Sequence, residues 1–339
     1  MMDRRAVMAA MGAAGLALPA RAAETGVSGW REAVLITPDA APWVETLTAV
    51  GGWEVAWKGR SDAGQSRLWG LPASARGREV LMRNKGTDQG YIRLVTLSGV
   101  PQQRIRSNDQ AWEIGGIMDL DIRVTDMAAS QKALEARGWS AGAEPVTYEF
   151  GKFKVIEWLP KSPDGVRLAL IQRLAPALVG WPELKRWSRA FNTTIVVPEI
   201  ETGHQLIGDG LGFGTYSQSK AVAPTGLTVM ALPKSVAMTL ISETLILGPG
   251  GLNDGSIEMI TMPQEMGRNF AETAKPPNFG LAALRFPVRD ATALAASLQA
   301  RGVVLASPMV DLNLAPYGPV RSFAVRGPQG AWFEMFQPL

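Results

Sequence analysis

The segment Pro163-Asp164-Gly165-Val166-Arg167-Leu168-Ala169-Leu170-Ile171-Gln172 decides the fold, because its design recurs along the chain. A second copy starts at Pro328-Gln329-Gly330 and runs to Gln337. Looser copies occupy residues 254–261 and 89–96. In each copy a glycine turn leads into a short run of the apolar and β-branched residues that favour a strand. The copies indicate an internal repeat whose last element is a strand.

Each of these closing strands follows an opening strand and a helix. In the second repeat, residues 118–124 have the composition of a strand, Asp126 can cap a helix, and Arg137-Gly138 ends that helix. The same order of strand, helix and glycine exit occurs over residues 33–53, 193–213 and 281–302.

Opening strand, helix, glycine exit and about three further strands make a βαβββ module. Four such modules fill the chain, which predicts the α+β class. The segment 174–189 contains prolines and charges and reads as a connector. We therefore expect two domains, with the first module pair over 28–173 and the second over 190–339.

The first 23 residues have the layout of an export signal. Arg4-Arg5 precedes an uncharged run rich in Ala, Met, Leu and Gly, and Ala20-Arg21-Ala22 places small residues at a cleavage site. The paired arginines resemble a twin-arginine signal. We expect the export machinery of that route as a partner and a periplasmic or secreted location. The apolar run is too short to cross a bilayer, and no membrane span is expected after the signal is removed.

Composition excludes several classes of protein. Hydrophobic residues make up 46% and charged residues 19% of the chain, which is ordinary globular material. There are no cysteines, so a disulfide framework or a thiolate site is excluded. The net charge of +3 falls to +1 without the leader, because Arg4, Arg5, Arg21 and Asp3 leave with it. A nucleic-acid partner is therefore not expected.

The Pro163-Asp164-Gly165 turn, the Leu211-Gly212-Phe213 exit and the fourfold module order resemble the vicinal oxygen chelate superfamily. That superfamily includes glyoxalase, bleomycin- and fosfomycin-resistance proteins and extradiol dioxygenases. The resemblance covers nearly all of the chain after the leader. It implies that modules pair into curled mixed sheets, each enclosing a cavity with the helices outside. It also implies that a small molecule binds inside the cavity, and a homodimer is compatible with it.

In the superfamily, ligand positions lie near the start of each opening strand and in the middle of each closing strand. The resemblance places the opening positions at Glu32, Asp119, Asn192 and Ala283, and the closing positions at Arg93, Leu168, Glu258 and Glu334. None of these residues is histidine. The one histidine of the sequence, His204, falls in the expected helix of the third module. Ring-cleaving dioxygenase activity, which needs two histidines, is therefore not expected.

The second module pair keeps Glu258, Glu334 and Asn192 at matching positions. These three residues are the candidate metal ligands, and oxygen donors of this kind suit Mg²⁺, Mn²⁺ or Ca²⁺, with Fe or Zn as further candidates. Without a metal, two carboxylates in one cavity raise each other's pKa, which suits a general base or acid. The alternative is that the glutamates pair with Arg285 or Arg321.

The first module pair has Glu32, Arg93, Asp119 and Leu168 at these positions. An arginine between two carboxylates satisfies them without a metal, which favours a salt-bridged core. Alternatively Arg93 binds a substrate carboxylate. Glu32, Arg93 and Asp119 thus join Asn192 as candidate substrate-binding residues.

Two features bear on the ligand. Trp30, Trp43, Trp53, Trp57 and Trp69 gather in the first module, where they either line an aromatic pocket or fill the interface between modules. The glycine-rich stretch 247–254 precedes a closing strand and is expected at a cavity rim.

The leading hypothesis is an exported lyase or isomerase that acts on a small apolar or aromatic molecule, with Glu334 and Glu258 as its catalytic carboxylates. The alternative is a binding or resistance-type protein without turnover. A stoichiometric divalent ion in the purified protein would favour the metal-dependent version.

Overall fold

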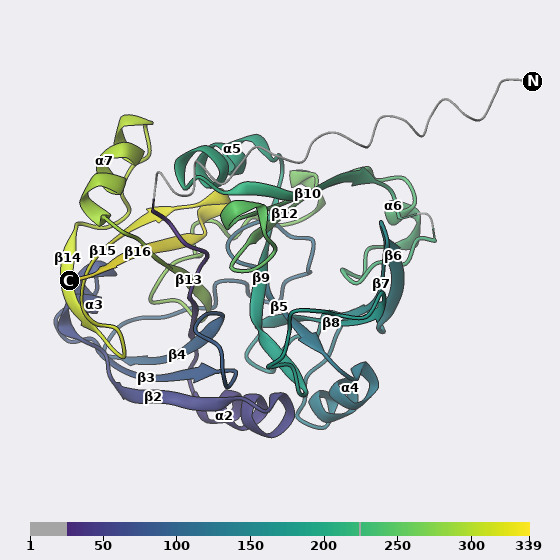
Figure 1. Cartoon of the computed structure of the whole chain (residues 1–339), viewed down its shortest axis with the longest axis horizontal. Coiled ribbons are helices and arrows are strands. Elements are labelled where there is room, and N and C mark those ends of the chain that lie inside the picture. The colour runs from purple at the N-terminus through teal and green to yellow at the C-terminus, as the bar shows by residue number, and fades with distance from the viewer. Residues whose placement is uncertain (1–25, 224) are drawn as a thin grey trace, which may run out of the picture.

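The structure is a computed structural model that describes residues 26–223 and 225–339. The predicted export signal lies outside these residues. The strands form two eight-stranded mixed sheets, which lie side by side in Figure 1. In order across the first sheet, the strands are β14 (Val310–Leu314), β15 (Gly318–Arg326), β16 (Trp332–Pro338), β13 (Gly280–Pro287), β1 (Glu32–Ile36), β4 (Tyr91–Ser98), β3 (Arg76–Arg83) and β2 (Glu54–Arg60).

The second sheet consists, in the same manner, of β10 (Gly214–Ala221), β11 (Ser242–Gly248), β12 (Ile257–Thr261), β9 (Trp187–Val197), β5 (Asp119–Val124), β8 (Arg167–Ala175), β7 (Phe153–Trp158) and β6 (Val146–Phe150). The helices are α2 (Ala41–Thr46) with its continuation η1 (Leu47–Gly51), α3 (Ala63–Leu68), α4 (Met127–Glu135), α5 (Glu201–His204) with η2 (Gln205–Gly210), α6 (Lys234–Ala237) and α7 (Ala291–Ala300). Three short 3₁₀ turns are η3 (Pro249–Gly251), η4 (Gln264–Met266) and η5 (Pro328–Gly330).

The four predicted βαβββ modules are present. In every module the opening strand lies parallel to the closing strand, as β1 does to β4 and β13 does to β16. The predicted caps of two helices are also present, because the side chain of Asp126 accepts from Ala129 N and that of Asp290 accepts from Ala293 N. The α+β class and the curled mixed sheets are thereby confirmed.

The pairing of the modules differs from the sequence expectation. Strand β1 pairs with β13, so the first module shares a sheet with the fourth. Strand β5 pairs with β9, so the second module shares a sheet with the third. Figure 1 shows this by colour, since the left-hand sheet joins the purple and yellow ends of the chain and the right-hand sheet holds its teal and green middle. The loop between β8 and β9 therefore connects two modules within one sheet.

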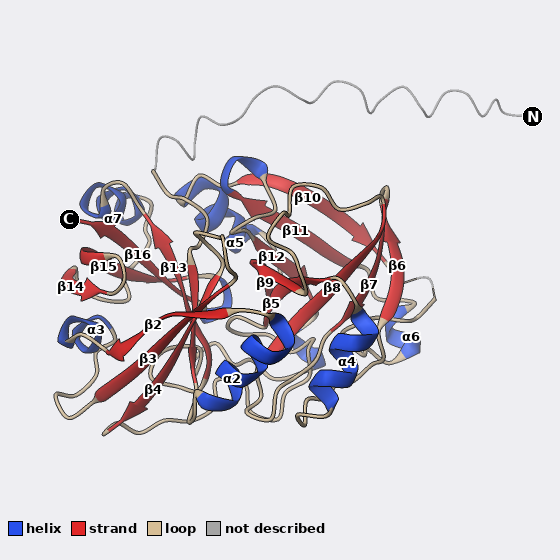
Figure 2. Cartoon of the chain, turned by 60° about the horizontal axis from the view of Figure 1, so that its bottom comes forward, coloured by secondary structure: helices blue, strands red, loops and turns tan. Residues whose placement is uncertain are grey.

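The main hydrophobic core lies between the two sheets and their helices. It collects the apolar residues that alternate with polar ones along the central strands, including Leu35 of β1, Leu120 of β5 and Phe286 of β13. Because side chains along a strand alternate between faces, the polar residues of the same strands lie on the opposite, concave faces. Figure 2 brings α2 and α4 to the front, where they lie next to each other over the junction of the sheets.

Three of the five tryptophans of the first module, Trp30, Trp43 and Trp53, fill interfaces between modules, as one of the two interpretations expected. The Trp43 ring packs edge-on against Trp139 of the second module at 5.1 Å. Trp30 Nε1 donates to Ser256 O at 2.8 Å, and Trp53 Nε1 donates to Ser188 O at 3.1 Å. These contacts tie the first module to the other sheet. In the described part of the chain, no helix is both long and apolar enough to cross a membrane.

Candidate functional site

The concave face of the first sheet holds a buried ion network centred on Glu32. Arg93 donates to both oxygens of Glu32 at 2.7 and 2.9 Å, Arg285 Nη1 donates at 2.7 Å, and Tyr317 Oη donates at 2.9 Å. Arg93 Nη1 also donates to Glu79 at 2.7 Å. Burial alone would raise the pKa of Glu32, but Arg93 and Arg285 lower it to about 2. Glu32 is therefore ionised and fully engaged at neutral pH.

Glu334 belongs to the same network. Its Oε2 accepts from Arg285 Nε at 2.6 Å, and its Oε1 accepts from Trp69 Nε1. Arg285 Nη2 donates to Gln65 Oε1 at 2.6 Å. A buried carboxylate whose two oxygens are both engaged is held as a partner in an ion pair. The alternative that paired Glu334 with Arg285 is therefore the correct one.

The concave face of the second sheet carries a different arrangement, in which carboxylates face each other. The Nδ2 atom of Asn192 donates to Asp121 Oδ2 at 2.9 Å and to Glu258 Oε2 at 3.2 Å. Its Oδ1 accepts from Ser256 Oγ at 2.7 Å, which orients the amide. Oδ1 of Asp121 is buried without a hydrogen-bond partner among the described residues. One acceptor of this cluster is therefore free.

Two further carboxylates complete the cluster. Asp119 precedes Asp121 by two residues on β5, and the backbone N–H of Thr194 donates to its Oδ1 at 3.1 Å. Glu157 lies on β7 and accepts a hydrogen bond from the Tyr148 hydroxyl of β6. We call Asp119, Asp121, Glu157 and Glu258 the acid cluster.

The pKa values of the acid cluster are raised. Burial raises the pKa of Asp121 to about 6, although hydrogen bonds and the nearby Arg123 oppose the shift. Burial and the charge of Asp121 raise the pKa of Glu157 to about 7. For Asp119 and Glu258, burial and the neighbouring carboxylates raise the pKa well above the usual range. Side chains that change protonation near neutrality are typical of proton-transfer sites.

The structure regroups the residues that the sequence singled out. Asp119, Asn192 and Glu258 lie on the second sheet, whereas Glu32, Arg93 and Glu334 lie on the first. The cause is the pairing of β1 with β13 and of β5 with β9. Glu258 and Glu334 therefore do not share a cavity, and the salt-bridged reading applies to Glu32 with Arg93 but not to Asp119.

Two of the eight aligned positions differ by register. Leu168 packs in the main core, so its neighbours Arg167 and Ala169 face the other side of β8. Ala283 lies opposite Val34 on β1, and the polar residue of that face is Arg285, two positions further on and opposite Glu32. At Leu168 a shift of one residue turns the side chain to the other face of the strand, whereas Ala283 and Arg285 are two residues apart and share a face.

Sequence reasoning missed Asp121 and Glu157. Asp119, Asp121 and Arg123 alternate with apolar residues along β5, so the period of two already indicated three polar side chains on one face. Glu157 alternates in the same way along β7. The alignment of modules assigned one residue per strand and therefore passed over these neighbours.

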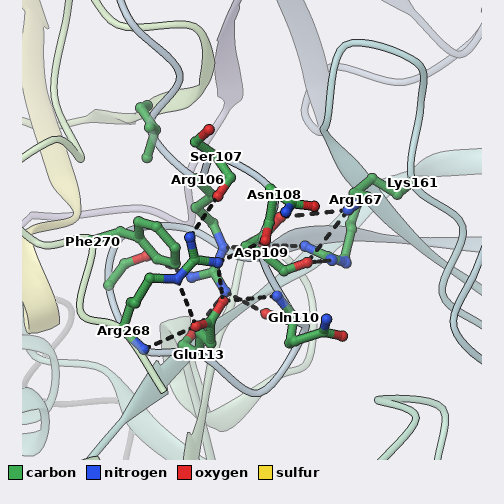
Figure 3. Close-up of polar contacts among 12 residues, drawn as sticks. Arg106, Ser107, Asn108, Asp109, Gln110, Glu113, Lys161, Arg167, Arg268 and Phe270 are labelled. Atoms are coloured by element: carbon green, nitrogen blue, oxygen red, sulfur yellow. Dashed lines mark hydrogen bonds and ion pairs between the residues drawn. The ribbon is translucent and has the colours of Figure 1, made fainter.

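Figure 3 shows a network of polar contacts between loop residues next to Arg167, which begins β8 of the second sheet. Asp109, in the loop between β4 and β5, accepts from Arg106 Nε at 2.8 Å and from Arg167 at the start of β8. Nearby, Arg268 donates to both oxygens of Glu113 at 2.9 and 3.0 Å. These pairs join the loop that enters β5 to the loop that follows β12, next to the strands that carry the acid cluster.

The residues do not fit a divalent metal as they are placed. Such an ion needs several oxygen donors directed at one position, but Asn192 turns its NH₂ group toward Asp121 and Glu258. Within residues 26–223 and 225–339, no three His, Asp or Glu side chains form a metal-holding group. The expected ligand set of Glu258, Glu334 and Asn192 cannot form one site, because Glu334 belongs to the other sheet.

Histidine does not contribute to the polar networks of the two sheets. His204 ends helix α5, as expected from the sequence, and the chain has no other histidine. The two-histidine site of a ring-cleaving dioxygenase therefore cannot be assembled from this chain.

Four βαβββ modules in two half-barrel sheets define the vicinal oxygen chelate fold. Among solved structures, the chain is similar to glyoxalase I from Zea mays, with a TM-score of 0.59 and 12% identity over 94% of each chain. A mutant of that protein gives a TM-score of 0.60 and 12% identity over 94% of this chain and 95% of the other. A putative dioxygenase from Bacillus subtilis gives 0.56 and 12% over 93% of this chain and 86% of the other.

No family model matches the sequence, and no curated protein matches it. At these identities the likeness concerns the fold, and function must be argued from the site.

Proposed function

We propose that this protein is a small-molecule enzyme of the lyase or isomerase kind, in which the acid cluster of the second sheet transfers a proton next to a carbonyl group. The observation that carries the proposal is the placement of Asp121 and Glu157 on one concave face, with pKa values raised to about 6 and about 7. Glu258 supports the cluster. Glu334, the other carboxylate expected to be catalytic, is assigned a structural role instead.

The two raised pKa values favour Asp121 as the proton acceptor and Glu157 as the proton donor. Because its pKa is the lower of the two, Asp121 becomes ionised at a lower pH than Glu157. The free Oδ1 of Asp121 takes the proton from the carbon beside the carbonyl, so that the C–H bond breaks and an O–H bond forms on Asp121. Glu157 donates its proton to the carbonyl oxygen, which gives an enol.

Where the enol is conjugated with a C=C bond, Asp121 returns its proton to the far carbon of that bond and the enol O–H returns its proton to Glu157, which shifts the double bond without any co-reactant. Where the β-carbon carries a leaving group, the enol O–H returns its proton to Glu157, the bond to that group breaks, and Asp121 gives its proton to the departing group, which is the lyase outcome. Asn192 bridges Asp121 and Glu258 by donating to both, so the two carboxyl groups stay in place when their charges change.

The experiment measures hydrogen–deuterium exchange at the carbon beside the carbonyl group. The protein is incubated in D₂O at about pH 6.5 with a panel of ketones and 2-oxo acids, and proton NMR records the loss of the C–H signal beside the carbonyl. We expect at least one compound to exchange faster than in buffer, and Asp121→Asn to slow that exchange by about 100-fold or more. Asp88→Asn, an exposed change outside the cluster, serves as the control.

A binding protein without turnover is the second candidate, favoured by the oriented and largely buried cluster. It would bind members of the panel and exchange none of them. Exchange that Asp121→Asn leaves unchanged would remove the acid cluster from the mechanism. A stoichiometric divalent ion in protein purified without added metal or chelator would contradict the metal-free version.

Export by the twin-arginine route is part of the proposal. The paired arginines Arg4 and Arg5 support it. The full chain is expected in the periplasm, and the variant with Arg4→Lys and Arg5→Lys is expected to stay in the cytoplasm.

A further inference from the structure

Two arginines lie beside the acid cluster and form no direct ion pair with it among the described residues, although the charge of Asp121 acts on Arg123. Arg123 follows Asp121 by two residues on β5 and therefore lies on the same concave face. Arg173 lies on the neighbouring strand β8. Among the described residues, neither guanidinium donates a hydrogen bond or forms an ion pair that accounts for it, and the Nε atom of each is buried without a partner. Arg123 is only 8% exposed.

Aromatic rings hold both guanidinium groups in place. Arg123 lies over the ring of Phe191 at 4.3 Å and over that of Trp181 at 4.8 Å. Arg173 lies over the ring of Phe153 at 4.0 Å. Stacking of this kind covers the flat faces of a guanidinium but leaves its N–H edge free. The edges are the part that binds an anion.

The electrostatics of the pair are unfavourable as they stand. Burial lowers the pKa of Arg123 to about 10, and repulsion from Arg173 contributes to the shift. Burial also lowers the pKa of Arg173. Elsewhere in the interior, Arg93 and Arg285 each bind carboxylates directly. Arg123 is buried and no described carboxylate binds it directly, which is costly and points to a missing anion.

We propose that Arg123 and Arg173 bind the carboxylate of the substrate, so that the substrate class of this site is a small organic acid with an apolar or aromatic remainder. The inference rests on the proposed function of the acid cluster. A planar carboxylate matches the fork of donors on a guanidinium. Trp181 and Phe153, which are only partly buried, give the remainder of the molecule an aromatic surface.

The spacing suits such a substrate. Two residues along a strand span about 7 Å, so a carboxylate held at Arg123 places carbons a few bonds away beside Asp121. Tyr216 of β10, at the opposite edge of the sheet, lies within electrostatic range of both arginines. It can donate to the same carboxylate from the other side.

The test compares acids with their neutral counterparts. Isothermal titration calorimetry measures binding of phenylacetate and 4-methylpentanoate, and of the corresponding primary amides. We expect each acid that binds to bind about tenfold or more tightly than its amide. Arg123→Met and Arg173→Met are expected to abolish that preference. Arg321→Met, in the exposed ion pair of the first sheet, is the matched control and is expected to keep it.

A stability measurement separates binding from folding. Replacing an unpaired buried cation by an apolar side chain of similar length relieves its desolvation, so Arg123→Met is expected to unfold at a urea concentration no lower than wild type. Arg93→Met, which takes the arginine from Glu79 and one of two arginines from Glu32, is expected to unfold at a lower one. Equal binding of acids and amides by wild type, or a preference that survives both arginine variants, would overturn the inference.

Asp121→Asn distinguishes this failure from failure of the proposed function. It is expected to keep the preference for acids while losing proton exchange. If the arginine variants bind as wild type does but Asp121→Asn still abolishes exchange, the inference is wrong and the proposed function stands. If the preference for acids holds but Asp121→Asn exchanges as wild type does, the anion site stands and proton transfer by the cluster is wrong.

Discussion

The side-chain amide of Asn192 donates a hydrogen bond of 2.9 Å to Asp121. The same nitrogen donates to Glu258 at 3.2 Å, so one amide joins two carboxylates that would otherwise repel each other. Both hydrogen bonds lower the pKa of their acceptor against the larger effect of burial. The amide therefore tunes the protonation of the acid cluster.

Asn192→Ala removes that tuning. We expect the pKa of Asp121 and that of Glu258 to rise, by up to about one unit, because one hydrogen bond is worth about 1 kcal/mol. Carbon-13 NMR of labelled Asp and Glu carboxyls measures the shift. Asn313→Ala, at an exposed position of β14, is the control. A lower or unchanged pKa at Asp121 would show that the hydrogen bond does not stabilise the ionised form.

Stability should fall as pH rises toward neutrality. The pKa of Asp121 is about 6 in the folded protein and 3.8 in its ordinary state, so the folded state holds more protons between these values. Stability is therefore lost as pH rises across that window. Asp121→Asn should flatten the decline between about pH 4 and pH 7 in urea unfolding. The exposed variant Asp88→Asn should follow wild type, and an equal decline in both variants would contradict the assignment.

The acid side of the stability profile depends on other groups. Burial would raise the pKa of Glu113, but hydrogen bonds from Arg268 and from backbone N–H groups lower it to about 2. Its contribution is present above the ordinary value of 4.5 and is lost as pH falls toward 2. Glu113→Gln should therefore move acid unfolding, followed by circular dichroism, to higher pH. Glu45→Gln, in an exposed pair with Arg137, should not.

Glu334→Gln tests the structural role of the first sheet. The change weakens a buried ion pair with Arg285, and we expect a loss of about 3 kcal/mol in the free energy of unfolding. Proton exchange by the second sheet should remain. Asp311→Asn breaks an exposed pair of the same kind and should leave stability unchanged. Loss of exchange in Glu334→Gln without loss of stability would return this residue to the active site.

The repeat made the modules predictable, because glycine turns and helix caps are local signals. Asp126 and Asp290 cap the helices that the sequence assigned to them. Which two modules share a sheet was not predictable in this way, because the backbone edge of an opening strand can pair with that of any other opening strand. Pairing of β1 with β13 joins residues about 250 positions apart, as the Arg285 to Glu32 bond shows.

The site was predictable in part, and for a physical reason. Asn192, at an opening-strand position, and Glu258, at a closing-strand position, were expected to lie together and do so. Glu334 has the same position and residue type as Glu258, but Arg285 neutralises it, and that arginine lies two residues from the aligned Ala283. Charge balance on a concave face depends on several strands at once, so an alignment of single positions could not separate a free carboxylate from a paired one.

Proton transfer by the second sheet requires that Asp121 and Glu157 be protonatable near neutral pH on its concave face. Carbon-13 NMR titration of the labelled carboxyl groups, with Asp121→Asn and Glu157→Gln for assignment, tests it without any substrate. We expect two carboxyls that titrate near pH 6 and pH 7, each absent from one variant. Titration of every Asp and Glu carboxyl below about pH 5 would contradict it.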